Sequence, residues 1–307
     1  MELIFRRGLM AIPTLLLLSL VVFLLLELVP GDVTTTALDI TASTEQADHL
    51  RAELGLERPV MVRYIDYIGS LLQGNMGVSA KSGQPVIREI GIRMPYTILL
   101  VGAAIVLGTI IGVTLGAVAA FQQGKAADWM VTVLVSVTTA LPIFWLALLL
   151  VQFFALRLRI LPVFGADSWQ HLILPAACTA LTLVPGIARL TRASLLENIH
   201  SNHILFAHTK GLRPRRVIWR HITPLAAISV VTYIGLQTVR LISSAAVMEV
   251  LFNWPGLGGL AVRAAFDRDA TMLLGTTLVI AALTFAILFL LDAIVLYLDP
   301  RISRKAI

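Results

Sequence analysis

Histidine and cysteine are among the residues of this chain whose chemistry could support catalysis or metal binding. The six histidines are His49, His171, His200, His203, His208 and His221. His200, His203 and His208 come closest to a cluster, but on a helix residues five apart lie on different faces. We therefore interpret them as solvated or partner-facing side chains and predict no metal site. The single Cys178 cannot form a disulfide within the chain and is typical of a small buried hydrophobic residue.

The motifs of nucleotide-binding and hydrolytic enzymes are missing from the sequence. A P-loop follows the pattern G-x-x-x-x-G-K-[ST], and the one Gly-Lys pair, Gly124-Lys125, is followed by Ala126. Neither H-E-x-x-H nor G-x-S-x-G occurs. The sequence therefore predicts no catalytic residue and no cofactor bound by this chain.

Three charged residues interrupt long apolar stretches: Arg240, Glu249 and Asp292. On insertion scales a charge at the centre of a membrane-spanning helix costs about 2.5–3.5 kcal/mol, so such residues usually face a bundle interior or water. Gln237, Arg240 and Ser244 share one helix face, which we interpret as the lining of a water-filled translocation path. The alternative is a buried Arg240 paired with Asp292 or with a partner subunit.

The elements that must position these residues are membrane-spanning helices. Of 307 residues, 58% are apolar and 14% are charged, and the mean hydropathy is +0.87; soluble domains have about 25% charged residues. Six predicted spans cover residues 9–29, 97–121, 130–156, 172–190, 225–251 and 272–298. The first is too long for the core of a signal peptide and lacks a cleavage site, so we interpret it as retained. The fold class is an all-α polytopic membrane protein.

The distribution of Lys and Arg predicts the orientation of the spans. With the N-terminus inside, thirteen basic residues fall in inner segments: Arg6, Arg7, Lys125, Arg189, Arg192, Lys210, Arg213, Arg215, Arg216, Arg220, Arg301, Arg304 and Lys305. Only four fall in the short outer loops: Arg157, Arg159, Arg263 and Arg268. The positive-inside rule then predicts an N-in, C-in topology. The net charge of +6 does not indicate nucleic-acid binding, because a membrane protein that keeps Lys and Arg in its inner loops has the same excess of positive charge.

The predicted organisation follows from this topology. Residues 1–29 form the N-terminal tail and first span, 30–96 an extracytoplasmic subdomain, 97–298 a five-helix core, and 299–307 a cytoplasmic tail. In the subdomain, Ser43 or Thr44 is typical of a helix start, and residues 59–72 are amphipathic. In the second span, Gly108, Gly112 and Gly116 are four apart, which favours close approach of another helix.

The inner loop at about residues 194–224 has the clearest local pattern. Ser201 or Asn202 can cap a short helix over 203–210, and Gly211 suits the position after its end. The pattern predicts a defined element in this loop.

The composition of that short helix favours docking to another protein. Ala207 and Gly211 are four apart, so one face is nearly bare, and Leu205 and Phe206 add apolar surface. Pro214 suits the first turn of a second helix. The alternative is an amphipathic helix that rests on the membrane.

Residues 206–212 (FAHTKGL), followed nine positions on by His221, resemble the EAA loop of permease subunits of binding-protein-dependent ABC importers, most closely the peptide, nickel and glutathione branch. Further segments agree with this branch in chain order: 30–32 (PGD), 54–59 (LGLERP) with 72–79 (LQGNMGVS), 142–147 (PIFWLA), 249–258 (EVLFNWPGLG) and 299–301 (DPR). Their order over nearly the whole chain makes the resemblance specific.

The sequence departs from that pattern at a few positions. The family commonly has an aromatic residue at His203, an arginine at His208 and a proline near Ser229, whereas this chain has Pro224. These changes leave the small residues of the docking helix intact and affect the hinge between the loop and the fifth span.

The resemblance implies a type I ABC importer permease fold and assigns roles to several residues. Residues implied to couple to an ATPase subunit are His203, Leu205, Phe206, Ala207, Lys210 and Gly211. Those implied to have a gating or periplasmic role are Glu249, Trp254, Pro255 and Gly256.

The resemblance also implies partners and a location. The partners are a second, homologous permease subunit in a heterodimer, two ATPase subunits that hold ATP and Mg, and a periplasmic or lipid-anchored solute-binding protein. The location is the bacterial inner membrane, and the chain itself is non-catalytic. The implied solute is a di- or oligopeptide, glutathione, or nickel or its chelate. The alternative is a secondary transporter or channel that works alone, for which Pro142, Pro175 and Pro185 could break helices, although no internal repeat is visible.

Overall fold

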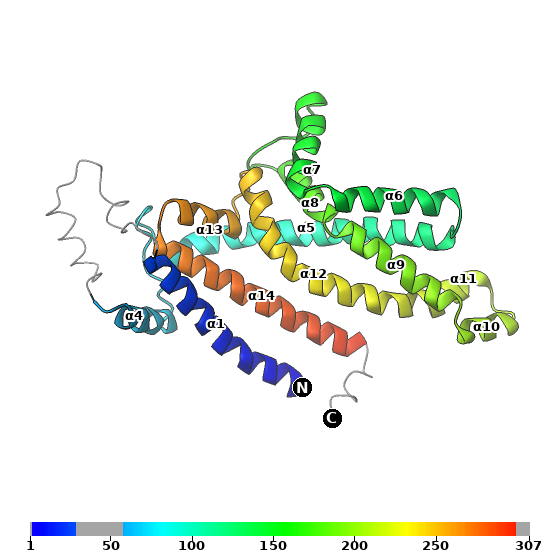
Figure 1. Cartoon of the computed structure of the whole chain (residues 1–307), viewed down its shortest axis with the longest axis horizontal. Coiled ribbons are helices and arrows are strands. Elements are labelled where there is room, and N and C mark those ends of the chain that lie inside the picture. The colour runs from blue at the N-terminus through cyan, green and yellow to red at the C-terminus, as the bar shows by residue number, and fades with distance from the viewer. Residues whose placement is uncertain (1, 29–57, 299–307) are drawn as a thin grey trace. The chain divides into compact units, whose positions relative to one another are not determined.

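The computed structural model describes residues 2–28 and 58–298, and these residues form helices joined by short connections (Figure 1). Within the described ranges no strand occurs beyond an isolated β-bridge between Val78 and Pro85. The chain divides into two compact units, Met1–Thr97 with Trp254–Ala286, and Ile98–Asn253 with Ile287–Ile307. The helix start predicted near Ser43 lies outside the described residues.

The first unit contains the first span and most of the last one. Its helices are α1 (Glu2–Leu28), α4 (Val60–Leu72), the first part of α5 (Val86–Phe121), α13 (Leu257–Phe266) and most of α14 (Ala270–Leu298). Helix α4 confirms the amphipathic stretch predicted at 59–72. Its Tyr64 hydroxyl lies 2.9 Å from the carbonyl oxygen of Leu16 and 2.8 Å from the hydroxyl of Ser19, which joins α4 to α1.

Apolar packing and buried polar contacts hold the first unit together. Val86 and Ile90 of α5 pack with Leu257 of α13 and the start of α14. The carboxylate of Asp269 accepts hydrogen bonds from the hydroxyl of Ser79 at 2.5 Å and the amide of Met272 at 3.0 Å. Asp269 thus caps the start of α14 and ties the 78–85 turn to it.

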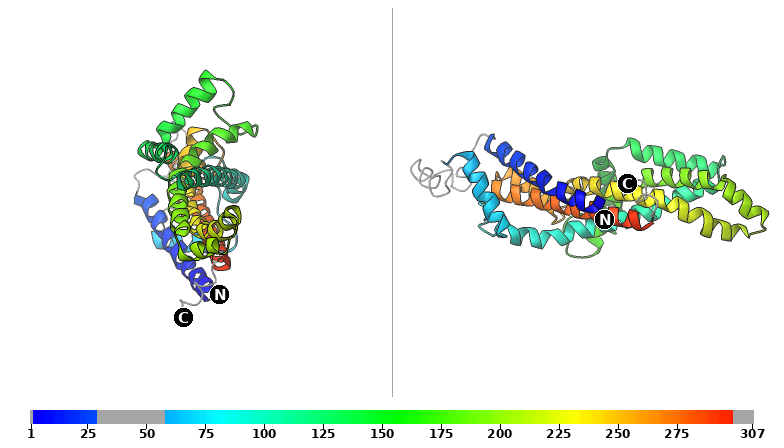
Figure 2. Two further views of the ribbon diagram at one scale, coloured as in Figure 1. Left: turned by 90° about the vertical axis from the view of Figure 1, so that its right-hand side faces the viewer. Right: turned by 90° about the horizontal axis from the view of Figure 1, so that it is seen from below.

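The second unit contains the remaining helices, which Figure 2 shows from two further directions. They are the rest of α5, α6 (Ala126–Ala140), α7 (Ile143–Leu150) with a π-helical extension (Val151–Arg157), α8 (Gln170–Leu181), α9 (Val184–Ile199), α10 (Asn202–Thr209), α11 (Pro214–Val217) with a π-helical turn (Ile218–Ile222), and α12 (Thr223–Leu251). The end of α14 also belongs to this unit. The short helix predicted at 203–210 and the helix start predicted at Pro214 are confirmed, with α10 shifted by one residue.

The glycines of α5 confirm the predicted close approach. A Cβ atom on Gly112 would lie 2.7 Å from Cβ of Ile187 on α9, and one on Gly116 would lie 2.5 Å from the carbonyl oxygen of Ala188. These distances leave no room for a side chain. The small residues therefore let α5 pack backbone to backbone against α9.

The predicted third and fourth spans are broken rather than continuous. Within residues 2–28 and 58–298, four stretches are long and apolar enough to cross a membrane, Met10–Leu28, Val86–Phe121, Pro214–Leu251 and Ala270–Leu290, and the count rises to six if each of two bent pairs forms one span. The break between α6 and α7 bends the chain by 106°, and the break between α8 and α9 bends it by 52°. At the first break Leu141 is extended, as expected for a residue before proline, and Pro142 cannot donate a helical hydrogen bond.

Candidate functional site

Helix α10 is a short element with defined ends. Its first turn is closed by the amide of Leu205, which donates to the carbonyl oxygen of Ser201 at 3.2 Å. At its other end Gly211 has a φ of +73°, and the amide of Leu212 donates to the carbonyl oxygen of Ala207 at 3.3 Å. A glycine in the left-handed region is the usual way to end a helix, so Gly211 ends α10 as predicted. The hydroxyl of Ser201 donates to the carbonyl oxygen of Asn198 at 2.6 Å, and the predicted cap by Ser201 or Asn202 stays a prediction.

One face of α10 packs on its own chain, and the other is open. Ile204 and Ala207 are 1% and 7% exposed. They belong to an apolar cluster with Ala120, Leu195, Val217, Ile222 and Ala226. On the outer face Leu205 and Phe206 are 66% and 60% exposed, and the ammonium group of Lys210 lies 4.6 Å from the centroid of the Phe206 ring.

The expectation that Ala207 and Gly211 form one outward face is wrong for Ala207. Ala207 lies three residues after Ile204, so helical geometry places both on the inward face. Gly211 is exposed, and no atom lies within 4 Å of where its Cβ would be. The outward surface of this segment is therefore made by Leu205, Phe206, Lys210 and Gly211, and the predicted role in coupling stays a prediction. The side chains of His203 and His208 lie outside the described part of the structure.

An ion pair fixes the helix that leads into α10. The guanidinium of Arg192 on α9 makes two hydrogen bonds, of 2.7 and 2.8 Å, to the carboxylate of Asp128 on α6. The amide of Gly124 also donates to Asp128 at 3.1 Å. This two-point contact ties the start of α6 to α9 with a fixed geometry. The two residues are far apart in the chain, so no local sequence pattern predicted this contact.

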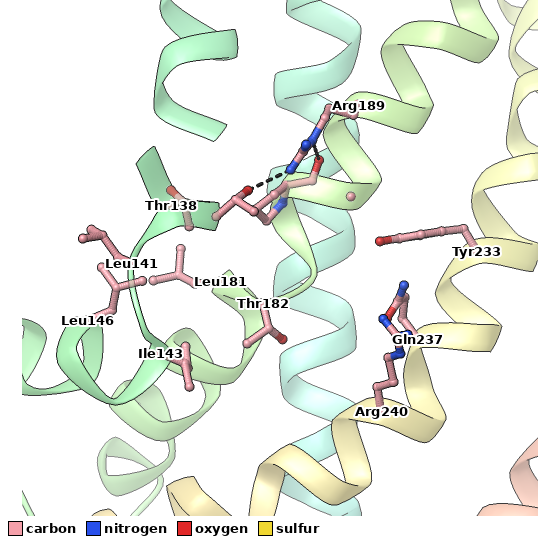
Figure 3. Close-up of a pocket in the computed structure, with 13 residues that line it drawn as sticks. Thr138, Leu141, Ile143, Leu146, Leu181, Thr182, Arg189, Tyr233, Gln237 and Arg240 are labelled. Carbon is pink, nitrogen blue, oxygen red and sulfur yellow. Dashed lines mark hydrogen bonds between the residues drawn. The ribbon is translucent and has the colours of Figure 1, made fainter. Parts of the chain in front are cut away.

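A cavity of about 480 Å³ lies in the second unit, next to both helix breaks (Figure 3). Leu141 at the α6–α7 break and Thr182 at the α8–α9 break both line it. Irregular backbone at membrane depth is tolerated where it is buried in protein or lines a water-filled cavity. The bends at the two breaks therefore open the space between α6, α9 and α12 in which the cavity lies.

The polar groups of the cavity come from three helices. They are Thr138 and Thr139 of α6, Arg189 of α9, and Tyr233, Gln237 and Arg240 of α12, with Thr182 between α8 and α9. Among the described residues that line the cavity there is no aspartate, glutamate, histidine or cysteine. The site thus presents two positive charges with hydroxyl and amide groups, a composition that suits an anionic or zwitterionic solute.

The two arginines are held differently. The guanidinium of Arg189 donates to the hydroxyl of Thr139 at 2.7 Å and to the carbonyl oxygen of Pro185 at 3.3 Å. Arg240 is an exposed side chain on α12 and lines the cavity beside Gln237. Figure 3 shows the side chains of Gln237 and Arg240 on α12, across the cavity from α6.

The side chain of Arg240 is exposed, so this chain by itself does not bury it. The alternative pairing of Arg240 with a partner subunit stays a prediction. The side chain of Asp292, its suggested partner, lies outside the described part of the structure. The structure places Gln237 and Arg240 on the cavity wall, but Ser244 is absent from that wall and its hydroxyl donates to the carbonyl oxygen of Leu241 at 3.1 Å. Whether this wall belongs to a translocation path stays a prediction.

The ring of Tyr233 on α12 packs directly against Gly186 on α9. A Cβ atom on Gly186 would overlap the hydroxyl oxygen of Tyr233 and lie 2.5 Å from Cζ of its ring. Only a glycine leaves room for this ring at the cavity wall. Sequence reasoning missed the pair, because a single glycine in an apolar helix carries no local signal of its partner.

The predicted gating residues divide between the two units. Glu249, at the end of α12, is completely buried. In the first unit the indole nitrogen of Trp254 donates to the carbonyl oxygen of Tyr96 at 3.0 Å, and the two rings meet edge to face at 5.6 Å. Pro255 follows, and Gly256 is the cap residue before α13. The surroundings of Trp254 are those of an anchored turn, and a gating role for these residues stays a prediction.

Two family models match the chain. Residues 112–304 match the binding-protein-dependent transport system inner membrane component, and residues 1–101 match the N-terminal part of the corresponding membrane component.

Curated relatives match over nearly the full length of both chains. A dipeptide transport system permease protein of Alkalihalophilus pseudofirmus is 34% identical over 97% of this chain and 98% of its own. An oligopeptide transport system permease protein of Bacillus subtilis is 32% identical, with 98% of both chains covered. A glutathione transport system permease protein of Escherichia coli is 33% identical over 98% of this chain and 99% of its own.

A solved structure shows the same fold. An inward-facing structure of the MetNI methionine ABC transporter matches with a TM-score of 0.59 and 19% identity, over 69% of this chain and 97% of the matched chain.

Proposed function

Because the chain belongs to the family of binding-protein-dependent transport system inner membrane components, and is thus a multi-pass permease subunit of an ABC importer, we propose that it forms half of a translocation path for a peptide or peptide-like solute. The cavity is the observation that carries the choice of solute. Two arginines and several neutral hydrogen-bonding groups line it, and the carboxylate of a peptide or of glutathione complements them.

A bare nickel ion fits this cavity poorly. Divalent transition metals bind imidazole, thiolate or carboxylate ligands, and the described lining offers none of them. Within the described residues, moreover, no group of three or more such side chains is placed to hold a metal. A chelated metal, which carries carboxylates of its own, is compatible with the lining. The relatives named for dipeptide, oligopeptide and glutathione transport support the same choice.

Energy for transport comes, in this proposal, from separate ATPase subunits that hold ATP and Mg, while this chain is non-catalytic. The outward surface of α10 docks onto one of them through Leu205, Phe206, Lys210 and Gly211. The chain pairs with a second, similar permease as a heterodimer, and a solute-binding protein delivers the solute from outside. A stand-alone secondary transporter is not favoured, because the family depends on a binding protein.

The proposed orientation is N-in and C-in, which places α10 inside and the 78–85 turn outside. The charge distribution supports it. Ser82 is exposed in that turn, so Ser82→Cys in a Cys178→Ala background should react with an impermeant maleimide in intact spheroplasts. Labelling that appears only after lysis would reverse the topology.

Uptake of a labelled dipeptide by cells that express the complete transporter tests the solute path. Arg240→Lys keeps the charge but loses the planar fork that binds a carboxylate with two hydrogen bonds, so uptake should fall modestly. Arg240→Leu should reduce uptake strongly with unchanged amounts of permease in the membrane. Normal uptake by Arg240→Leu would remove this residue from the path, and loss of the protein from the membrane would assign it a structural role.

A further inference from the structure

The segment from Arg213 to Arg220 carries a charge that neither the cavity nor the coupling surface uses. It holds four basic residues, Arg213, Arg215, Arg216 and Arg220, and the sequence has no acidic residue between positions 198 and 248. The four arginines are all exposed. Trp219 lies among them and is 74% exposed.

The inner side of this segment is fixed, so its charged side points away from the protein. Val217 and Ile222 are 1% and 3% exposed and belong to the apolar cluster under α10. Trp219 lies between these two buried residues in sequence but on the other side of the helix. Its indole is therefore held outward by the packing of its neighbours rather than by a chance rotamer.

The position of the segment places it at the edge of the apolar layer. The helical stretch Pro214–Leu251 is one of the four long enough to cross a membrane, and the arginines stand at its first turns. Tryptophan favours the level of the lipid headgroups, where its ring is amphipathic, and basic clusters beside a span attract anionic lipids.

A second exposed tryptophan is an independent indication of where the lipid headgroups lie. Trp129 lies in the first turn of α6, is 69% exposed and follows Lys125 by four residues. The connection from α5 to α6 lies at the same end of the second unit as α10 and α11, in both Figure 1 and Figure 2. Two outward indoles, each beside basic residues, at one end of one unit are the arrangement of an interfacial belt.

From these observations we propose that the 213–220 segment is a binding surface for anionic phospholipid headgroups. The phosphate of the lipid is held by Arg216 and Arg220, and the indole of Trp219 lies between headgroup and acyl chain. An acidic surface of an ATPase subunit is a different partner for the same charges. The lipid is favoured because Trp219 lies at the start of the apolar span Pro214–Leu251. The exposed apolar residues that suit a protein partner, Leu205 and Phe206, lie on α10 instead.

Lipid retention by the assembled transporter tests this surface and does not depend on which solute is carried. The transporter is reconstituted into vesicles of equal parts phosphatidylcholine and phosphatidylglycerol, extracted with mild detergent, and its bound lipid is counted by mass spectrometry. Arg216→Gln with Arg220→Gln should lower the preference for phosphatidylglycerol by about fivefold for each arginine removed. Arg216→Lys with Arg220→Lys should retain it, because the charge is kept.

A matched control removes the same charge elsewhere in the unit. Arg157 and Arg159 are also exposed beside apolar residues, and their replacement by glutamine should leave the retained phosphatidylglycerol unchanged. An equal fall in both double variants would show a nonspecific charge effect and overturn the proposal. Unchanged lipid with loss of the ATPase subunits from Arg216→Gln/Arg220→Gln would assign the segment to the ATPase instead.

Discussion

The α10 segment and the cavity belong to the same unit but are built in opposite ways. Helix α10 is eight residues long, and its ends and its outward side chains follow from residues within one short stretch. The cavity wall is assembled from α6, α7, α8, α9 and α12, whose contributing residues span positions 138 to 240. A docking element can therefore be encoded locally, whereas a solute site in a bundle requires several helices to break and pack correctly.

The two regions also differ in what supports them. Beneath α10 lies an apolar cluster in which Ile204 and Ala207 take part, so the surface above it can vary without loss of the fold. The cavity has no such separation, because Arg189, Thr139 and Tyr233 both line the space and hold the helices. Substitutions should separate docking from stability in α10, and should affect transport and packing together at the cavity.

The largest expected effect concerns the outer face of α10. Leu205→Ala with Phe206→Ala should detach the ATPase subunits and reduce uptake by roughly thirtyfold or more, since truncating a central contact at a protein interface costs about 2 kcal/mol or more. The thermal stability of the permease should not change, because both side chains are exposed. Co-purification of the ATPase subunits and an unfolding curve in detergent measure the two effects.

Ile204→Ala is the matched control from the inner face of the same helix. Ile204 is 1% exposed, and truncating a buried isoleucine costs about 2–5 kcal/mol. This variant should lose stability, unlike the double variant. If the double variant keeps its ATPase subunits and normal uptake, α10 is not the docking element.

The next effect concerns the contact at the cavity wall. Gly186→Ala places a methyl group where the Tyr233 hydroxyl lies, and overpacking of this kind costs about 1–3 kcal/mol. Tyr233→Ala in the same chain should recover the lost stability, because it removes the ring. The unfolding midpoint in detergent reports both changes.

Gly102→Ala is the control for the loss of a helical glycine. No atom lies within 4 Å of a Cβ at Gly102, so this change should be neutral or stabilising by up to about 1 kcal/mol. Equal stability of the Gly186→Ala and Gly102→Ala variants would contradict the close contact between α9 and α12.

A smaller effect is expected at the end of α10. Gly211 has a φ of +73°, and a side-chain-bearing residue in this region costs about 1–2 kcal/mol. Gly211→Val should therefore fray α10 and weaken attachment of the ATPase subunits, whereas Gly211→Asn should stay close to wild type, because asparagine tolerates this conformation. Hydrogen exchange of the 202–212 amides would show the difference, and equal protection in both variants would contradict it.

The sequence predicted what short-range patterns encode. The end of α10 at Gly211, the helix start at Pro214 and the close packing of Gly112 and Gly116 all follow from residue type and spacing. The order of motifs also predicted the family correctly. These features depend on the conformational preferences of single residues or on one helix face, which a sequence displays directly.

What the sequence did not predict depends on contacts between distant segments. Pro142 was visible, but a proline inside an apolar run is also compatible with a mild kink, so residue type alone did not predict a bend of 106°. The inward direction of Ala207 depends on the cluster beneath α10. The contact of Arg192 with Asp128 joins residues 64 positions apart, so no local pattern announces it.

The smallest predicted effect tests whether Arg189 contributes to the solute site. Thr139→Val keeps the volume of the side chain but removes the hydroxyl that accepts from Arg189 at 2.7 Å. The hydrogen bond between Arg189 and Thr139 is exposed to solvent, so it contributes about 1 kcal/mol net, and the apparent affinity for a dipeptide in uptake assays should change by about fivefold at most. The maximal rate should change little, because the arginine itself remains.

Thr138→Val provides the neighbouring control. Thr138 also lines the cavity, and its hydroxyl donates within α6 to the carbonyl oxygen of Leu134 at 2.9 Å, as the hydroxyl of Thr139 does to that of Val135 at 2.8 Å. Of the two hydroxyls, the one on Thr139 also accepts from Arg189. The cavity loses a hydroxyl group in both variants, and only Thr139→Val releases Arg189. A change in affinity confined to Thr139→Val would identify Arg189 as an oriented contact for the solute. Equal changes would show that the polarity of the wall matters and the orientation of Arg189 does not, which would leave Arg240 as the one arginine of the site with a role in transport.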